Sequence, residues 1–312
     1  MRRSWPDAHV TIACSAYNAS VVARNPDVDR VDVVPAGTSP AAFGRRYRGA
    51  CDLAIALAPC APDFELVGAT RARVRVGYTY VRRYLARATA RLYVTRLAVS
   101  EADPAICERD PAHVVRHEVD QVTDLVRLAG GTELAHDLGL PVDDADRRSV
   151  AHVPAGGICV HLGARWFSAG SSLESTIATI ADLRRFGLPV IATYGVDAEA
   201  NAAAVRAAGV ADVVAGDLSF TEWAAVFEKS RIVVTVDTGA THVASAMRRP
   251  TIVLFEHRYF QLSSQEWSPY RVPSICLRKP ATSDAPALAA SRASIVAAVE
   301  SLLGVADATA RV

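Results

Sequence analysis

Aromatic residues are scarce in this chain, at 7% of its 312 residues, and neither sign of charge prevails. The 34 Lys and Arg residues balance 33 Asp and Glu residues, which leaves a formal net charge of +1. A protein that binds nucleic acid needs a basic face, and no RNA- or DNA-binding motif is visible, so we expect no nucleic-acid partner. No apolar run approaches the roughly 18 residues of a membrane span, and no apolar segment of a signal peptide follows Arg2 and Arg3. We therefore expect a cytoplasmic protein.

The cysteine pattern gives no sign of a metal site. The six cysteines form no CxxC pair, and none stands at zinc-binding spacing from a histidine. Cys14 and Cys159 lie inside apolar, strand-like runs, so we predict that both are small core residues. Free thiols of this kind fit a reducing compartment. We expect neither a metal nor another cofactor.

One local cluster of charge stands out against the neutral background. It consists of seven arginines, namely Arg71, Arg73, Arg75, Arg82, Arg83, Arg87 and Arg91. The cluster is either a solvated surface or a face for an anionic acceptor or anionic lipid headgroups. The second interpretation would place the chain peripherally on the cytoplasmic face of the inner membrane.

Hydrophobic residues make up 51% of the chain, and short β-branched runs alternate with longer Ala-rich runs. This alternation predicts an α/β fold with parallel sheets. The first half has one well-defined helical pattern, at residues 111–128, which Gly130 and Gly131 end. The strands predicted there are His9–Cys14, Val31–Val34, Leu53–Leu57 and Val74–Val76.

The second half alternates strands and helices strictly, as in a doubly wound sheet. Residues 140–157 carry Pro, Asp and Gly with little periodicity and are interpreted as a linker, so we predict one domain over residues 1–145 and a second over 146–312. Ser219 and Glu222 form a capping box. The predicted strands are Ile158–Leu162, Pro189–Thr193, Asp212–Val214, Ile232–Val236 and Thr251–Phe255. The predicted helices are Ser172–Phe186, Ala198–Ala208, Ser219–Lys229, Gly239–Met247 and a terminal helix, Ser291–Leu303.

The segment VVTVDTGATHVASA, Val233–Ala246, is the strongest candidate for a binding site. In a parallel sheet, ligands bind beyond the carboxyl ends of the strands. Here a strand delivers Asp237 to that edge, and Gly239 allows a ligand to approach the backbone at a helix start whose N–H groups favour a phosphate. The hydroxyls of Thr238 and Thr241 and the ring of His242 are further candidate contacts. The alternative is that Asp237 or Thr238 merely caps the helix.

Two other strand ends carry residues of the same kind. Gly163, Ala164 and Arg165 follow the strand that ends at Leu162, where the glycine permits backbone approach and the arginine could neutralise a diphosphate. At the third strand end, Glu199 is a candidate donor contact, whereas we interpret Asp197 as a helix cap. Together the three ends outline one binding region.

Residues from about Gly157 to Lys279 resemble glycosyltransferase family nine, the ADP-heptose:lipopolysaccharide heptosyltransferases. The family pattern D-[ST]-G-x-x-H-x-x-[AS]-A stands here as DTGATHVASA, and Asn25–Val31 resembles the family's NP-VD-V turn. His117–Asp120 resembles its H-v helix start. The resemblance covers most of the chain, and the DTGxxH segment is its most specific part.

The resemblance implies a GT-B architecture of two Rossmann-like domains facing a cleft, and a nucleotide-sugar donor bound by the C-terminal one. It implies transfer to a lipopolysaccharide-core or other glycan acceptor, with inversion and without a metal. Carried over by motif, the donor contacts are Asp237, Thr238, Gly239 and His242, of which the aspartate meets sugar hydroxyls and the Thr-Gly backbone meets the diphosphate. Ala240 and Thr241, between them in the sequence, complete the predicted donor-binding segment.

The chain departs from the family pattern at two places. Met1–Ala8 resembles the end of the family's first helix, so the first strand, the glycine loop and the acidic general base of that loop are not visible, and the catalytic base is unassigned. Asp52 and Asp63 are candidate replacements, although both are typical of turn or cap residues. The family's K-R-W-P is also missing, and Arg165 takes the place of the lysine.

A doubly wound sheet without its central strand must pair the neighbouring strands directly or leave ladder groups unsatisfied. We therefore expect either a natural start upstream of Met1 or a decaying gene, and the intact mass of the native protein distinguishes the two. The leading hypothesis for function is a heptosyltransferase-type enzyme. The alternatives are a catalytically impaired homologue that binds nucleotide-sugars and a different GT-B enzyme such as a nucleotide-sugar epimerase.

Overall fold

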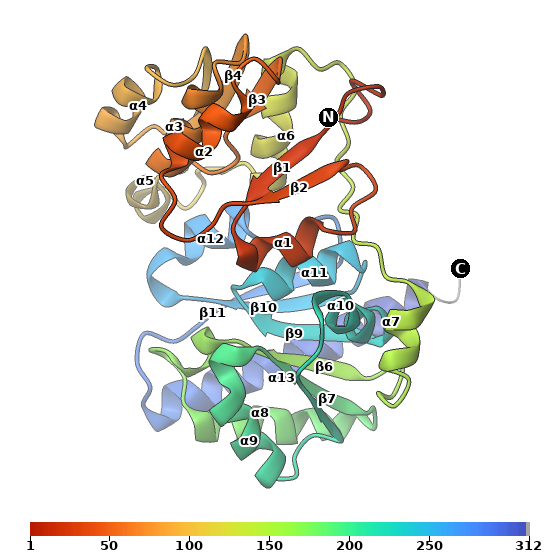
Figure 1. Cartoon of the computed structure of the whole chain (residues 1–312). Coiled ribbons are helices and arrows are strands. Elements are labelled where there is room, and N and C mark those ends of the chain that lie inside the picture. The colour runs from red at the N-terminus through yellow and green to blue at the C-terminus, as the bar shows by residue number, and fades with distance from the viewer. Residues whose placement is uncertain (310–312) are drawn as a thin grey trace. The chain divides into compact units, whose positions relative to one another are not determined.

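The structure, a computed structural model, describes residues 1–309 and divides into two compact units (Figure 1). Unit 1 comprises residues 1–137, and unit 2 begins at Leu138. The division lies eight residues before the boundary predicted between residues 145 and 146. The predicted linker contains a short helix, α7 (Asp144–Ser149), because Asp143 and Asp146 form a capping box there.

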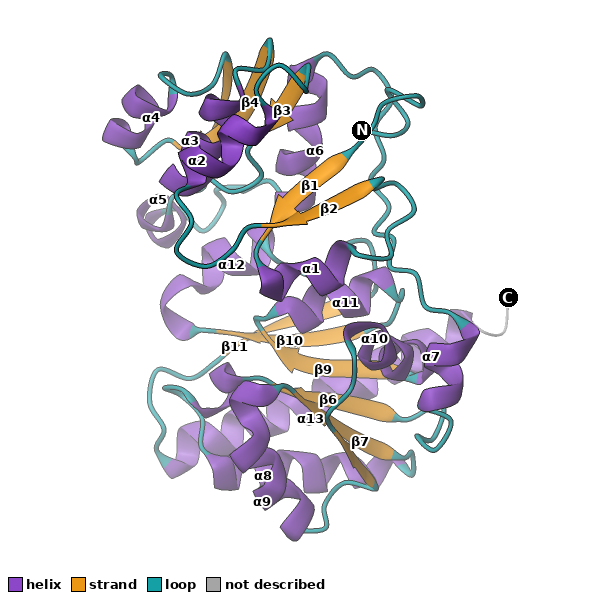
Figure 2. Cartoon of the chain, viewed as in Figure 1, coloured by secondary structure: helices purple, strands orange, loops and turns teal. Residues whose placement is uncertain are grey.

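Unit 2 is built on one parallel six-stranded sheet (Figure 2). The strand order is β11-β10-β9-β6-β7-β8. Every residue of β6, β9 and β10 is buried, as expected for strands that helices cover on both faces. The strands are β6 (Ile158–Leu162), β7 (Val190–Tyr194), β8 (Val213–Ala215), β9 (Ile232–Val236), β10 (Thr251–Phe255) and β11 (Ser274–Arg278).

Alternate residues of each central strand face opposite helical layers, as the two-residue period of a strand requires. Ile158, Val160 and Leu162 of β6 join one core, whereas Cys159 joins the other. The first layer comprises α8 (Leu173–Leu183), α9 (Glu199–Ala207) and α13 (Ala285–Thr309). The second comprises α10 (Phe220–Lys229) and α11 (Gly239–Ala246), and α7 packs against α10. The remaining elements are α12 (Phe260–Glu266), η2 (Ala164–Phe167), η3 (Arg184–Phe186), η4 (Val196–Ala198) and η5 (His257–Tyr259).

By length and composition, the segment Ala285–Gly304 of helix α13 is long and apolar enough to cross a membrane. Its side chains show a different use, because Ile295, Val299 and Leu302 are at most 4% exposed and belong to the core of unit 2. A core helix of a globular protein can have the same length and apolar composition. One face of α13 therefore packs in the core of unit 2.

Unit 1 contains two separate parallel sheets instead of one. Strands β1 (Thr11–Cys14) and β2 (Arg30–Val33) form the first, and β3 (Leu53–Ile55), β4 (Val74–Tyr80) and β5 (Arg96–Ser100) form the second. The second sheet packs between α3 and α4 on one face and α6 on the other. The helices are α1 (Ala16–Val22), α2 (Pro40–Gly44), η1 (Arg45–Tyr47), α3 (Ala61–Thr70), α4 (Tyr84–Ala90), α5 (Pro104–Arg109) and α6 (Glu118–Ala129).

Several local expectations, most of them for unit 1, were wrong. The predicted helix over residues 111–128 begins only at Glu118, because the side chain of His117 caps it, although Gly130 does end it in a left-handed conformation. Residues 1–8 form turns rather than the end of a helix. Cys159 is fully buried as predicted, but Cys14 is half-exposed. Strands β5 and β11 and helix α12 were not predicted.

Candidate functional site

The candidate site lies at the carboxyl edge of the sheet of unit 2. Strands β9, β6 and β7 are neighbours in that sheet and run parallel. The loops that follow them therefore begin side by side. These loops carry Asp237, Arg165 and Asp197, respectively. The sequence-based expectation that three strand ends form one region agrees with this arrangement.

The junction between β9 and α11 presents a helix N-terminus to this region. Thr238 is the N-cap, and its hydroxyl accepts a long hydrogen bond of 3.4 Å from the amide of Ala240. Within the described residues, the N–H of Gly239 has no hydrogen-bond partner. A Cβ added to Gly239 would meet no atom within 4 Å. The helix start therefore offers an open backbone donor, which is the local geometry that binds phosphates.

Arg165 and Asp237 form an ion pair across two of these loops. The guanidinium of Arg165 donates to the carboxylate of Asp237 and, at 2.7 Å, to its backbone carbonyl. Burial raises the pKa of the Asp237 carboxyl, whereas the charge of Arg165 opposes that shift. The Arg165 side chain is 51% exposed. A cation that can still reach solvent is thus held beside the N-terminus of α11.

Gly163 lets the loops after β6 and β9 approach closely. A Cβ at this position would lie 3.1 Å from the methyl carbon of Thr238, which is tighter than ordinary van der Waals contact. On the other side, the carboxylate of Asp197 accepts a 3.0 Å hydrogen bond from the amide of Ala164. The interpretation of Asp197 as a helix cap was wrong, since the N-cap of α9 is Ala198 and no side chain caps this helix. Asp197 instead ties the β7 loop to the β6 loop.

A buried lysine supports the loop that carries Arg165. The Lys279 side chain is 1% exposed, and its ammonium donates to the carbonyl of Arg165 (2.7 Å), the hydroxyl of Ser168 (2.7 Å) and the carboxylate of Glu256 (3.1 Å). Burial lowers the pKa of Lys279, and the contact with Glu256 opposes this shift. The lysine therefore orders the backbone from Arg165 to Ser168.

His161 lies beneath the site and is neutral at physiological pH. It is 9% exposed and lies against Trp223, with ring centroids 4.7 Å apart. Its Nδ1 is 3.0 Å from the Thr193 hydroxyl. Burial lowers the pKa of His161 to about 4. This histidine packs under the sheet edge and does not act as a cation for a donor.

The other predicted site residues differ in how deeply they are buried. Glu199 is exposed at the start of α9, and the ring of His242 packs against Trp267 with centroids 5.9 Å apart. Ala240 and Thr241 are buried, and the Thr241 hydroxyl has no hydrogen-bond partner within the described residues. In this conformation Thr241 does not present its hydroxyl at the surface. Contact of these residues with a donor stays a prediction.

Sequence reasoning missed Lys279, Glu256 and the role of Asp197. Glu256 directly follows a predicted strand, so the strand-end rule could have found it. Lys279 could not be found in this way because β11 was not recognised as a strand. Its side chain reaches Arg165, which is 114 residues away in the sequence.

The two candidate bases named from the sequence, Asp52 and Asp63, both lie in unit 1. Asp63 lies in the first turn of α3, and its carboxylate accepts a 3.2 Å hydrogen bond from the amide of Ala58. This contact agrees with a turn or cap role. Asp52 lines a cavity in unit 1. In the part of the chain that the structure describes, no group of three or more His, Cys, Asp or Glu side chains is arranged to hold a metal ion.

Residues 178–293 match the family described as Glycosyltransferase family 9 (heptosyltransferase). This span includes the DTGATH segment and both α11 and β10. The matched residues lie within unit 2, and the match confirms the resemblance drawn from the sequence and the glycosyltransferase class predicted with it. The search of curated proteins gave no match.

Solved structures resemble this chain over most of its length. A family 9 glycosyl transferase from Veillonella parvula DSM 2008 has a TM-score of 0.73 at 17% identity, covering 97% of this chain and 90% of that chain. E. coli ADP-heptose lps heptosyltransferase II has a TM-score of 0.71 at 15% identity, covering 97% and 91%. E. coli heptosyltransferase WaaC with ADP has a TM-score of 0.61 at 19% identity, covering 90% and 84%. At these identities the likeness shows the fold, and it confirms the predicted α/β, GT-B class.

Proposed function

We propose that this chain, whose second unit contains the residues that match glycosyltransferase family 9, transfers heptose from ADP-heptose to a lipopolysaccharide-core or other glycan acceptor, with inversion. The contact between Arg165 and Asp237 at the N-terminus of α11 is the observation that carries the proposal. It brings a cation, a carboxylate and an open backbone donor to one point. A nucleotide-sugar has matching groups, namely a diphosphate and sugar hydroxyls.

The proposed chemistry uses these groups when the donor's sugar–phosphate bond breaks. The bond between the anomeric carbon and the diphosphate oxygen breaks, and its electron pair leaves with the diphosphate. The growing negative charge is stabilised by Arg165 and by the free N–H of Gly239. The acceptor oxygen forms the new bond on the opposite face of that carbon, which inverts its configuration, and a base takes the hydroxyl proton. Asp237 orients the sugar through its hydroxyls.

We propose that this reaction needs no metal or other cofactor. Arg165 and the N-terminus of α11 supply the positive potential that a divalent cation supplies in other sites. Turnover in the presence of excess EDTA checks this point. Unchanged turnover is expected, whereas loss of turnover that Mg²⁺ restores would contradict it.

Calorimetry with ADP-heptose, paired with a product assay on a lipopolysaccharide-core acceptor, tests the function. We expect saturable binding of ADP-heptose and formation of a heptosylated product with inverted configuration. Binding without product would favour the second candidate, a homologue that binds nucleotide-sugars without transfer. The open space inside unit 1, described below, is the observation that favours that candidate. No binding of ADP-heptose would exclude both.

We also propose a cytoplasmic location with peripheral contact to the inner membrane through the region around α4. Tyr84, Leu85 and Leu92 are 75%, 84% and 79% exposed. Arg82 and Arg91 are exposed beside them. Apolar side chains among arginines suit an anionic bilayer surface. Co-sedimentation with phosphatidylglycerol vesicles should fall when Leu85 is replaced by Ser, while neutral phosphatidylcholine vesicles should bind weakly in both cases.

A further inference from the structure

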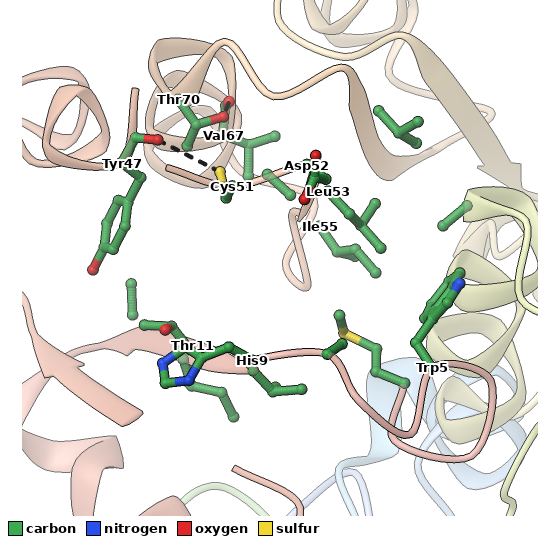
Figure 3. A pocket seen from close by; sticks show the side chains of 18 of the residues that line it. Trp5, His9, Thr11, Tyr47, Cys51, Asp52, Leu53, Ile55, Val67 and Thr70 are labelled. Atoms are coloured by element: carbon green, nitrogen blue, oxygen red, sulfur yellow. Dashed lines mark hydrogen bonds between the residues drawn. The ribbon is translucent and has the colours of Figure 1, made fainter. Parts of the chain in front are cut away.

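Unit 1 contains a cavity of about 1000 Å³ between the edge of β1 and the edge of β3. Figure 3 shows Thr11 on one side of this space and Leu53 and Ile55 on the other. Among the described residues, strand β1 pairs only with β2, and β3 pairs only with β4. Two strand edges of one folded unit therefore border the same open space, which we call the slot.

The hydrogen bonds of β1 show which backbone groups face the slot. The carbonyls of Val10 and Cys14 accept from the β2 side, from Asp29 and Val34. Because backbone groups alternate in direction along a strand, Ile12 also faces β2, and Thr11 and Ala13 face the slot.

The same alternation applies to β3. The carbonyl of Asp52 accepts from Val74, and the amide of Ala56 donates to Val76, both on the β4 side. Leu53 and Ile55 therefore direct their N–H and C=O groups to the slot. Within the described residues, these groups make no hydrogen bond to a second strand. Backbone groups left in this state are a template for pairing with another strand.

Strands β1 and β3 are less buried than the central strands of unit 2. All residues of β6 are buried, whereas all residues of β1 and β3 are half-exposed. Strand β1 contributes no side chain to either hydrophobic core of unit 1. Apolar side chains such as Ile12, Leu53 and Ile55 line the slot. The space is therefore both apolar and edged with unpaired backbone donors and acceptors.

We propose that the slot is a binding site for one further β-strand, an extended apolar polypeptide segment of about four or five residues that pairs in parallel with β1 and β3. Only an extended backbone presents alternating donors and acceptors to both edges at once. With that strand in place, the order β2-β1-insert-β3-β4-β5 is a single six-stranded parallel sheet, the size of the sheet in unit 2. The inference does not depend on the proposed transferase activity.

A tethered strand provides a direct test. The probe is the segment Lys-Val-Val-Ile-Val-Lys, joined to the full chain ahead of Met1 through a flexible Gly/Ser linker of about 16 residues. Such a linker spans roughly 20–24 Å. Because the probe runs parallel to β1, the linker must return along the whole length of the probe to reach Met1, and a five-residue strand is roughly 17 Å long. The linker is therefore long enough. Met1 itself lines the slot, so the tether starts nearby. The matched control replaces the central Ile of the probe with Pro, which has no N–H and breaks the ladder.

The measurement is amide hydrogen exchange resolved by residue. In the untethered chain, we expect the amides of Thr11, Ala13, Leu53 and Ile55 to exchange at least about tenfold faster than those of Ile12 and Ala54, which already face neighbouring strands. The tethered probe should slow the four slot-facing amides to the level of the other two, and the proline control should not.

Three results would overturn the proposal. The first is equal protection of all six amides in the untethered chain, because the slot would then be closed already. The second is exchange at the four slot-facing amides that the tethered probe does not slow. The third is the same protection from the proline control, because ladder hydrogen bonds would then not be its cause.

Discussion

Arg165 and Asp237 lie 72 residues apart in the sequence and form an ion pair where the loops after β6 and β9 meet. The guanidinium also donates to the carbonyl of Asp237, so the arginine is held to both the side chain and the backbone. The pair stands beside the N-terminus of α11. An incoming diphosphate would compete with the carboxylate for the guanidinium, which leaves the carboxylate available for sugar hydroxyls.

Asp237→Ala should weaken the binding of ADP-heptose about tenfold, or about 1.4 kcal/mol, with little change in the free energy of unfolding. The fold should tolerate the change because Thr238, not Asp237, caps α11. Calorimetry and thermal unfolding measure the two effects. The matched control is Asp212→Ala, which breaks the ion pair with Arg184 just before β8 and should leave donor affinity unchanged. Unchanged donor affinity in Asp237→Ala, with about 1 kcal/mol of lost stability, would instead indicate a purely structural role for Asp237.

Gly239→Ala should reduce donor affinity without destabilising the protein. A Cβ at Gly239 meets no protein atom, and Ala is favoured over Gly in a helix by up to about 1 kcal/mol. The methyl group would, however, occupy the space through which a phosphate reaches the backbone N–H. Gly304→Ala, in α13 and equally unobstructed, is the control and should bind the donor normally. Equal affinity in the two variants would argue against a phosphate at this helix start.

Lys279→Met should lower the free energy of unfolding by about 2 kcal/mol and also weaken donor binding. The change removes all three hydrogen bonds that the ammonium donates, including the one that holds the carbonyl of Arg165. Lys229→Met is the control, because Lys229 likewise donates to backbone carbonyls, those of Val150 and Val153. The control should lose stability and keep its donor affinity. If both variants bound the donor equally well, Lys279 would be only a structural residue.

The stability of the protein should fall as the pH drops from about 6.5 to about 4, in part because of His161. Burial lowers the folded-state pKa of His161 to about 4, so the unfolded chain takes up the proton first. The contribution of His161 to the free energy of unfolding is largest above its unfolded-state pKa near 6.5. Below that pH the contribution declines by up to roughly 1.4 kcal/mol per pH unit. Urea unfolding across this range measures how steeply the free energy of unfolding falls with pH. This fall should be smaller for His161→Asn than for the parent chain. Identical slopes would show that His161 does not contribute.

The strand-turn-helix signal at Val233–Ala246 was readable from the sequence because every part of it is local. An apolar strand, an Asp-Thr-Gly turn and a small-residue helix follow one another directly, and the structure has β9, the Thr238 cap and α11 at these positions. The start of α6 was misjudged for a related reason. The apolar spacing from Val114 onward is helical, but the side chain of His117 accepts from the amide of Val119 and sets the first turn later.

The sequence by itself determined the alternation of strands and helices, the α/β class and the candidate helix N-terminus, because each depends on residues within one turn or one strand of each other. Only the tertiary structure decided that Asp197 bonds Ala164, that Lys279 supports Arg165, and that β1 and β3 face each other across an open slot. These contacts join residues that are far apart in the chain. Their existence depends on strand order, and strand order is set by how the sheet packs as a whole.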